Sequence, residues 1–243
     1  MSRGKIIVEF QDDLCCLFLD NPSARNAVSK SMMTQLVQGV QTIEREKPKV
    51  LVISGRDGKG FCAGGDLVDV RKSLLQPFEG QKMSMLMTKQ LNRLKELPIF
   101  VIGAVEGGAI GGGAEILTVC DFIIAADTAK IGFVHASLGV SPGWGGGRRL
   151  VEMVGKRKAL QLLTTAKVYS ALQASNFGLI DEVVPPGSAY ERAYTLGKRI
   201  CSYSAPAICG AKEVVEGYKD TSKEMEIFLS LWGSKPHLKA LSL

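Results

Sequence analysis

The chain has 243 residues, of which 46% are hydrophobic and 22% are charged, with a formal net charge of +6. These proportions are typical of a globular protein, and no apolar run reaches the roughly 18 residues that a membrane-spanning helix needs. The positive charge favours an anionic partner, either a nucleic acid or a phosphorylated small molecule. Scattered solvated lysines explain it more simply, because the sequence has no long Lys/Arg block.

Six cysteines and two histidines limit the metal and disulfide chemistry that we expect. No two cysteines form a CxxC pair, so we predict no metal site. The cysteines are expected to be reduced and buried, as in a cytosolic protein. The first residues, MSRGKIIVEF, contain no apolar leader segment, which also favours the cytosol.

Strand and helix patterns alternate along the chain. KIIVEF and LCCLFLDNP are predicted strands around the turn QDD. Ser29 is a plausible N-cap of a long amphipathic helix, and KVLVISG is a strand buried on both faces. Later patterns predict a helix near DLVDV, a helix over 81–96, strands in PIFVIGAV, DFIIAAD and GLIDEVVP, and helices over 112–120, 148–165 and 188–231. The alternation indicates a mostly parallel α/β core.

Two glycine-bearing loops share one plan, in which a buried strand leads through the loop to an acidic residue at a helix start. The first is FCAGGDL, and the second is VEGGAIGGGAE, which has five glycines in eleven residues. The first turn of each helix leaves backbone N–H groups unpaired, and glycine permits close approach. Two such amides can converge on one oxygen and form an oxyanion hole, which stabilises enolates and tetrahedral intermediates. Tight strand–helix packing is the structural alternative.

Other motifs with glycine or a nucleophile do not fit. Ala114 and Glu115 stand where a Walker loop needs Lys and Ser/Thr. A dinucleotide fingerprint would lie mid-chain and out of frame, and the sequence has no GxSxG elbow. No serine in a sharp strand–turn–helix context lies beside His135 or His237, so a Ser-His-Asp triad is not expected.

Several segments resemble, in order, the motifs of the enoyl-CoA hydratase/isomerase family, also called the crotonase superfamily: NPSARNAVS, FCAGGDL, GGAIGGGAEI, CDFIIAA and GVSPGWGGGRRL. The resemblance implies an α/β spiral of ββα units over 1–186 and a helical region over 187–243 that mediates trimerisation, giving a homotrimer or hexamer. It implies an acyl-CoA substrate, with no separate cofactor and no nucleic-acid or membrane partner. The thioester oxygen would be held by the amides of Gly65 and Gly112.

The resemblance also implies where the substrate lies. Coenzyme A would contact Ser23, Ala24, Arg25, Ala63, Gly64, Asp66 and Leu67. Our own hypothesis, separate from the resemblance, is that Phe133 and Trp144 line the alkyl pocket, with core packing as the alternative for both. For Arg25, a solvated surface charge is the alternative.

One position departs from the hydratases of the family. These enzymes place two glutamates beside the thioester; one matches Glu115, whereas the other position holds His135. In a glutamate pair one carboxylate orients the water and the other moves its proton, so efficient hydration is not expected here. A structural role for His135 is the alternative.

Decarboxylation of a malonyl-type thioester needs the oxyanion hole and no second glutamate. The carboxylate leaves as CO₂ and its electrons form an enolate; a facing carboxylate would repel the substrate, whereas a histidine would attract it. The runs FVHASLGVSPGWGGGRRLVE and WGSKPHLKAL resemble the decarboxylating branch of the family. That resemblance implies ethylmalonyl-CoA as substrate, with methylmalonyl-CoA as a second one, and a metabolite-repair role that removes side products of promiscuous carboxylation.

The role of Glu115 stays open at this point. It is expected to position a water or the proton donor, to sit on the opposite face, or to be protonated through burial. Isomerisation or hydration of an enoyl-CoA by Glu115 alone is the alternative activity. A non-catalytic RNA-binding homologue is suggested by the basic composition, but the sequence lacks an interleaved basic and aromatic patch.

Overall fold

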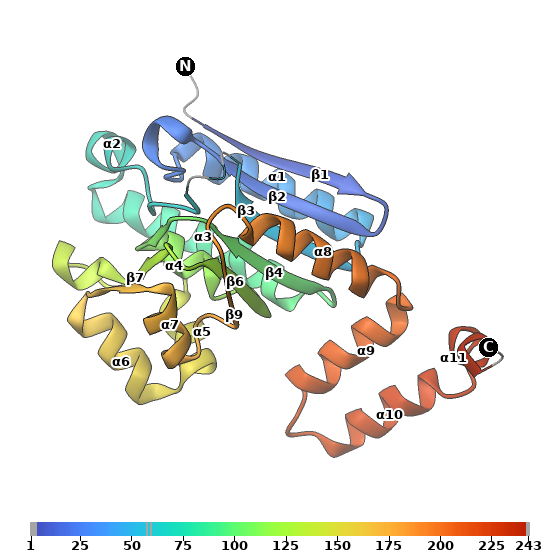
Figure 1. Ribbon diagram of the computed structural model, residues 1–243. Coiled ribbons are helices and arrows are strands. Elements are labelled where there is room, and N and C mark those ends of the chain that lie inside the picture. Colours follow the sequence, from blue (N-terminus) through green and yellow to red (C-terminus); the bar gives the residue numbers. More distant parts are fainter. Residues whose placement is uncertain (1–3, 57, 59, 242–243) are drawn as a thin grey trace.

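The computed structural model covers residues 4–56, 58 and 60–241, and its centre is a six-stranded sheet with helices on both faces (Figure 1). The strand order is β1-β2-β3-β4-β6-β9, and every neighbouring pair is parallel except β1 and β2. The strands are β1 (Lys5–Gln11), β2 (Leu14–Asp20), β3 (Val50–Gly55), β4 (Phe100–Val105), β6 (Phe122–Ala126) and β9 (Glu182–Val184). The predicted α/β core with a mostly parallel sheet is confirmed.

A second, smaller sheet has the order β5-β7-β8. Its strands are β5 (Gly108–Ile110), β7 (Lys130–Gly132) and β8 (Val168–Ser170). The sequence does not predict it, because strands of three residues are too short to show an alternating pattern. This sheet positions the site, since β5 lies within the second glycine loop just before α4, and β7 precedes His135.

The helices largely follow the predictions. They are α1 (Lys30–Glu46), α2 (Leu67–Asp69), α3 (Pro77–Glu96), α4 (Gly112–Leu117), α5 (Gly146–Val154), α6 (Lys156–Thr165), α7 (Ala171–Phe177), α8 (Ala189–Cys201), α9 (Ala205–Glu216), α10 (Thr221–Leu231) and α11 (Lys235–Leu241). Ser29 caps α1 as predicted, because its hydroxyl accepts a hydrogen bond from Met32 N (3.2 Å). None of these helices is long and apolar enough to cross a membrane.

The helices differ from the predictions in several places: α4 ends at Leu117 instead of residue 120, and the sequence patterns do not predict α7 or α11. α3 begins at Pro77 instead of residue 81, since proline suits the first helical turn, where its missing N–H is not needed. The helical stretch predicted over 148–165 is two helices, because Gly155 adopts a left-handed φ of 79° between α5 and α6.

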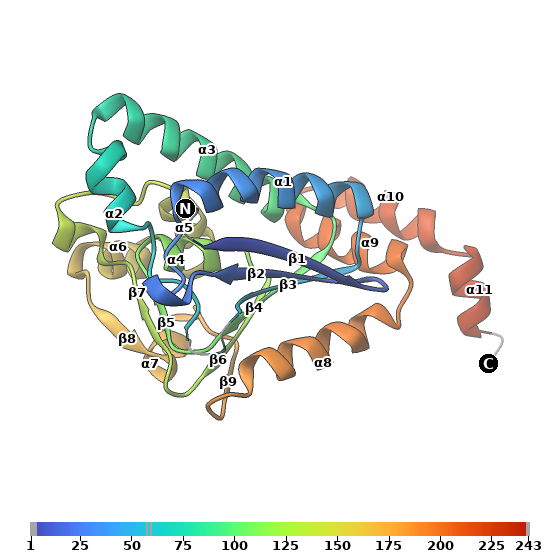
Figure 2. The same cartoon turned by 90° about the horizontal axis from the view of Figure 1, so that it is seen from above.

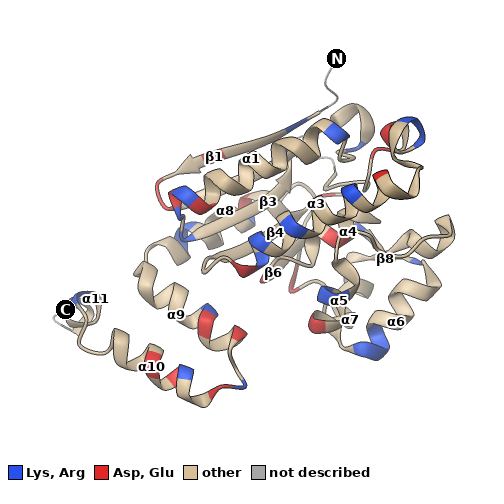
Figure 3. Cartoon of the chain, turned by 180° about the vertical axis from the view of Figure 1, so that it is seen from behind, with Lys and Arg blue, Asp and Glu red and all other residues tan. Residues whose placement is uncertain are grey.

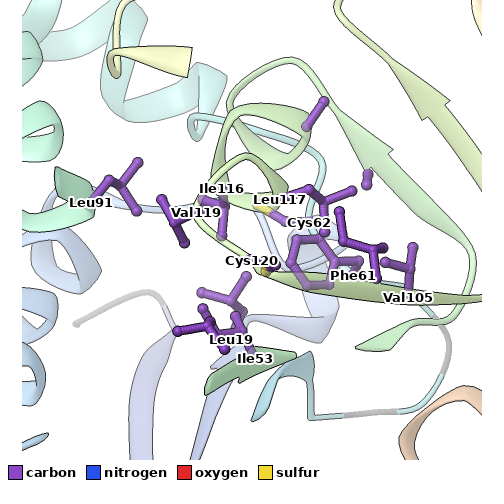
Figure 4. Packing of buried hydrophobic residues seen from close by; sticks show 14 of the residues in the cluster. Leu19, Ile53, Phe61, Cys62, Leu91, Val105, Ile116, Leu117, Val119 and Cys120 are labelled. Atoms are coloured by element: carbon purple, nitrogen blue, oxygen red, sulfur yellow. The ribbon is translucent and has the colours of Figure 1, made fainter. Parts of the chain in front are cut away.

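The core lies on both faces of the central sheet. Alternate residues of β3 face opposite sides: Leu51 and Ile53 join the cluster under α1 and α3, whereas Val50 and Val52 join the cluster under α8. Figure 2 shows α1 and α3 on one side of the sheet and α8 on the other. Figure 4 shows part of the first cluster, where Phe61 and Cys62 of the first glycine loop pack close to α4.

The helices α9, α10 and α11 form an arm that stands away from this body (Figures 1 and 2). Lys212 of α9 ties the arm to the body, since its ammonium donates to Ile99 O (2.9 Å) and to Asp121 Oδ2 (2.8 Å). The predicted boundary between 186 and 187 falls between β9 and α8, and α8 packs on the central sheet. The division there and the trimer stay predictions. Figure 3 shows Lys and Arg spread over many elements in this view, in keeping with scattered solvated charges.

Candidate active site

The two glycine loops lie side by side. The amides of Phe61 and Cys62 both donate to Gly108 O (3.1 and 2.9 Å), and Ile110 N donates to Cys62 O (2.9 Å). The first loop therefore runs along β5 like an extra strand. Its end is delivered to the start of α4, which follows β5 directly.

Glycine is required at two positions of this contact. A Cβ on Gly64, whose φ is +97°, would lie 2.9 Å from Ile110 O and 3.2 Å from the amide nitrogen of Gly112. A Cβ on Gly113 would lie 2.1 Å from Cys62 O. Real Cβ atoms do not approach backbone this closely, so the glycines allow the two loops to touch. This packing role exists alongside any role in binding.

The amides of Gly65 and Gly112 both lack an acceptor in the part of the chain that is described. Gly65 pairs with Val28 in a short bridge whose hydrogen bonds are made by its neighbours, Gly64 O and Asp66 N, so the Gly65 N–H points elsewhere. Gly112 is the first residue of α4, where no acceptor is available within the helix. Both glycines border the indole of Trp144. This arrangement can place two N–H donors around one oxygen.

Glu115 lies on α4 and is almost completely buried, with 1% of its surface exposed. Its Oε1 accepts hydrogen bonds from Gly143 N (3.2 Å) and lies 3.0 Å from His135 Nε2. Its Oε2 accepts from Trp144 N (2.8 Å) and Gly146 N (2.9 Å). A carboxylate has about four acceptor sites. The four contacts of the Glu115 carboxylate thus fill its acceptor sites and leave little capacity to hold a water.

His135 lies in the turn Val134–Leu138 after β7 and is 8% exposed. Three backbone amides already donate to Glu115, so the carboxylate also acts as acceptor toward His135 Nε2. The other ring nitrogen, Nδ1, is buried and has no hydrogen-bond partner among the described residues. Buried polar atoms are rarely left unpaired. The structure thus brings Glu115 and His135 together and leaves one histidine nitrogen available.

Arg149 is a buried residue of this site that the sequence analysis missed. It is 1% exposed, and its guanidinium donates to Thr118 Oγ1 (2.9 Å), Asn92 Oδ1 (2.7 Å) and Trp144 O (2.8 Å). Burial lowers the pKa of Arg149. A signal exists in the sequence: Gly146, Arg149, Leu150 and Met153 have the spacing of one helix face.

The residues expected to contact coenzyme A lie on two adjacent segments, 23–25 and 63–67. Ser23, Ala24 and Arg25 form a turn beside the first glycine loop, and Ala63 N donates to Arg25 O (3.1 Å). Arg25 and Leu67 are exposed. Gly64 is buried by its contact with the second loop.

Asp66 is buried, unlike the exposed residues Arg25 and Leu67 of these two segments. It is 3% exposed, and Oδ1 caps α2 by accepting from Val68 N (2.8 Å). Its Oδ2 is buried without a partner in the described chain. The side chain therefore has a structural task at the start of α2.

Phe133 and Trp144 are both buried in the main core cluster, at 2% and 4% exposure. Packing accounts for Phe133, which is among the largest fully buried side chains. Trp144 packs as well, but it also borders Gly65 and Gly112. Trp144 therefore lies beside the two glycine amides, whereas Phe133 has only a packing role in the structure.

Comparisons with known proteins identify the family of the chain. The family profile of enoyl-CoA hydratase/isomerase matches residues 9–228. Proteins named ethylmalonyl-CoA decarboxylase are 35% identical in Mus musculus, covering 97% of this chain and 76% of the relative, and 34% identical in Homo sapiens, covering 98% and 81%.

Solved structures show the same fold. An enoyl-CoA hydratase from Bacillus anthracis superposes with a TM-score of 0.91 at 27% identity, covering 98% of this chain and 94% of that one. An enoyl-CoA hydratase from Polaromonas superposes with a TM-score of 0.89 at 24% identity, over 98% and 96%. The predicted crotonase fold is confirmed, and the chain belongs to the enoyl-CoA hydratase/isomerase family.

Proposed function

We propose that this protein decarboxylates ethylmalonyl-CoA, and methylmalonyl-CoA as a second substrate, through a thioester enolate held by the amides of Gly65 and Gly112. One observation carries the proposal: the Glu115 carboxylate is engaged by three backbone amides and by His135, which stands where family hydratases have a second glutamate. The names of the relatives in Mus musculus and Homo sapiens support the same activity.

In the first step the bond between C2 and the carboxylate carbon breaks. CO₂ leaves, and the electron pair forms the enolate, with its negative charge on the thioester oxygen. Two backbone N–H groups donating to this oxygen stabilise the charge as it develops, without reorganisation of the protein. No base is needed for this step, which agrees with a Glu115 carboxylate whose acceptor positions are already occupied.

In the second step a proton adds to C2 and gives the acyl-CoA product, butyryl-CoA from ethylmalonyl-CoA. Glu115 Oε1 lies 3.0 Å from His135 Nε2, and this contact orients the imidazole ring. We assign the contact with the substrate carboxylate to His135 in its imidazolium form, through Nδ1–H, since Nδ1 has no partner among the described residues. The Nδ1 proton then passes to C2 and is replaced from solvent. Glu115 then acts as a positioning residue.

Hydration or isomerisation by Glu115 alone is less well supported. Both reactions need a carboxylate that exchanges a proton with water or substrate. The acceptor positions of Glu115 are taken by Gly143, Trp144, Gly146 and His135. A base in that role would have to give up hydrogen bonds that fix the turn before α5.

A comparison of substrates tests the proposal. The protein is incubated separately with ethylmalonyl-CoA, methylmalonyl-CoA and crotonyl-CoA, and both CO₂ release and loss of the enoyl double bond are followed. Butyryl-CoA serves as a control that yields neither signal. We expect CO₂ from the two malonyl thioesters and little hydration of crotonyl-CoA. Turnover of crotonyl-CoA far above that of the malonyl thioesters would overturn the proposal.

We further propose a cytosolic metabolite-repair role, in which the enzyme removes side products of promiscuous carboxylation. All six cysteines are free, and four of them are buried, which suits a reducing compartment. Imaging of the tagged full chain, together with ethylmalonyl-CoA levels in cells that lack it, tests this role. Localisation to an organelle, or unchanged ethylmalonyl-CoA, would contradict it.

A further inference from the structure

Trp144 is held beside the two glycine amides in a way that points to substrate selection. We infer that its indole sets the upper size limit for the alkyl group on C2 of the substrate. This inference rests on the proposed function for the position of the acyl group. The evidence is the contact of the ring with both glycines and the fixation of its backbone on each side.

The ring lies directly against the oxyanion site. A Cβ placed on Gly112 would come within 2.4 to 2.8 Å of three ring atoms of Trp144, and one on Gly65 would lie 3.7 Å from Cζ2. The thioester oxygen is expected between these two amides, and C2 is one bond away from the carbonyl carbon. A substituent on C2 therefore starts within contact range of the indole.

The ring cannot easily withdraw, because buried charged groups bind the backbone of Trp144. Its N–H donates to Glu115 Oε2 (2.8 Å), and its carbonyl accepts from Arg149 Nη2 (2.8 Å). The preceding carbonyl of Gly143 accepts from Ser84 Oγ (2.6 Å). Displacing the turn would leave buried polar groups unpaired, which is costly.

A rigid aromatic wall discriminates by size. One methylene in an apolar pocket changes kcat/KM by about 10- to 200-fold. A fixed indole beside C2 would therefore favour short alkyl groups over longer ones. A smaller side chain at position 144 should open the site to them.

The test compares Trp144→Leu with Trp232→Leu, which changes the other tryptophan of the chain, 63% exposed on the arm. The measured quantity is the ratio of kcat/KM for butylmalonyl-CoA to that for ethylmalonyl-CoA. We expect Trp144→Leu to raise the ratio by about 10-fold or more and Trp232→Leu to leave it unchanged. Trp144→Phe, which keeps an aromatic ring, should give a smaller rise and serves if the leucine variant does not fold. An unchanged ratio in a folded Trp144 variant would overturn the inference.

Binding provides a readout that does not depend on turnover. The dissociation constants of butyryl-CoA and hexanoyl-CoA should move closer together in Trp144→Leu.

Fluorescence gives a second measurement. In Trp232→Phe, Trp144 is the one remaining indole, and its emission should change when butyryl-CoA binds. If the wild type decarboxylates no malonyl thioester, the proposed function fails while these binding data still decide the role of Trp144. Equal selectivity in wild type and variant, or constant emission, would contradict the inference.

Discussion

The body and the arm of the molecule bury their residues very differently. Strand β2 is buried along nearly its whole length and β3 completely, whereas α10 and α11 bury none of their described residues. The candidate site draws all its residues from the body. The arm exposes apolar side chains instead, and Phe228, Leu229 and Trp232 are each more than half exposed. Exposed apolar groups of this size mark interaction surfaces.

The connection between the two regions is narrow and polar. Lys212 and Asp121 form an ion pair of 2.8 Å with side chains 9% and 14% exposed, and Lys95 contacts Glu216 at 3.0 Å. Helices of this length are marginal without packing partners. We therefore expect catalysis to depend on the body, and we expect the arm to need packing against a second copy of the chain. The following experiments test each half of this division.

The largest effect is expected at His135. His135→Ala should lower the rate of ethylmalonyl-CoA decarboxylation by about 100-fold or more, because it removes the proposed contact with the carboxylate and the proton relay. The dissociation constant of butyryl-CoA, measured by calorimetry, should stay unchanged. His237→Ala on α11 is the matched control and should keep the wild-type rate. A full rate in His135→Ala would reduce this residue to a structural role.

The next effect concerns the contact of the two glycine loops. Gly113→Ala places a Cβ 2.1 Å from Cys62 O, and both groups belong to the buried body. Overpacking of this kind costs about 1–3 kcal/mol, which lowers the melting temperature of a chain of this size by about 3–10 °C. Gly80→Ala in α3 is the control, since its Cβ would approach Leu74 O no closer than 3.7 Å. Equal melting temperatures would mean that the loops separate easily.

The arm is tested through its assembly. We expect the wild type to migrate as a trimer and Phe228→Asp, which places a charge on the exposed apolar face of α10, to shift it toward monomer in sedimentation experiments. Ser230→Asp adds the same charge on the same helix and is the control. A monomeric wild type, or a trimer that Phe228→Asp leaves intact, would show that this face does not join copies of the chain.

The smallest effect concerns thiol reactivity. Burial raises the pKa of Cys62 to about 12 and also raises the pKa of Cys209, and the thiolate is the reactive form. Cys201 and Cys209 are partly exposed, near and within the arm, so they should react first with a disulfide reagent. The four buried cysteines should react only after unfolding, as peptide mapping can show. Early labelling of Cys62 would reveal opening of the body beside the site.

Sequence predicts the parts of the site that local pattern controls. The apolar strands β3 and β4, the glycines before α4 and the cap at Ser29 are each visible within a short window. The partners of Glu115 are not, because Gly143 and Gly146 lie 28 and 31 residues further along the chain. No local pattern shows that a carboxylate and a distant turn satisfy each other.

The same limit explains the other differences. A helix signal around Arg149 does not say that the guanidinium is enclosed, since its neighbour Arg148 has the same chemistry and is exposed. The resemblance implies that Asp66 contacts coenzyme A, which stays a prediction, but it does not indicate that the side chain caps α2. Such outcomes depend on which elements meet in space.

The turn that precedes the first long helix has a consequence for how a ligand arrives. Arg25 and Asn26 adopt left-handed conformations in succession, and the side chains of Asn21 and Asn26 fasten the turn to Ala27 O and Gly60 O. This turn, which is expected to contact coenzyme A, is thus shaped during folding. Because the turn is already ordered, binding of a thioester should cost little backbone entropy, and we expect rapid association.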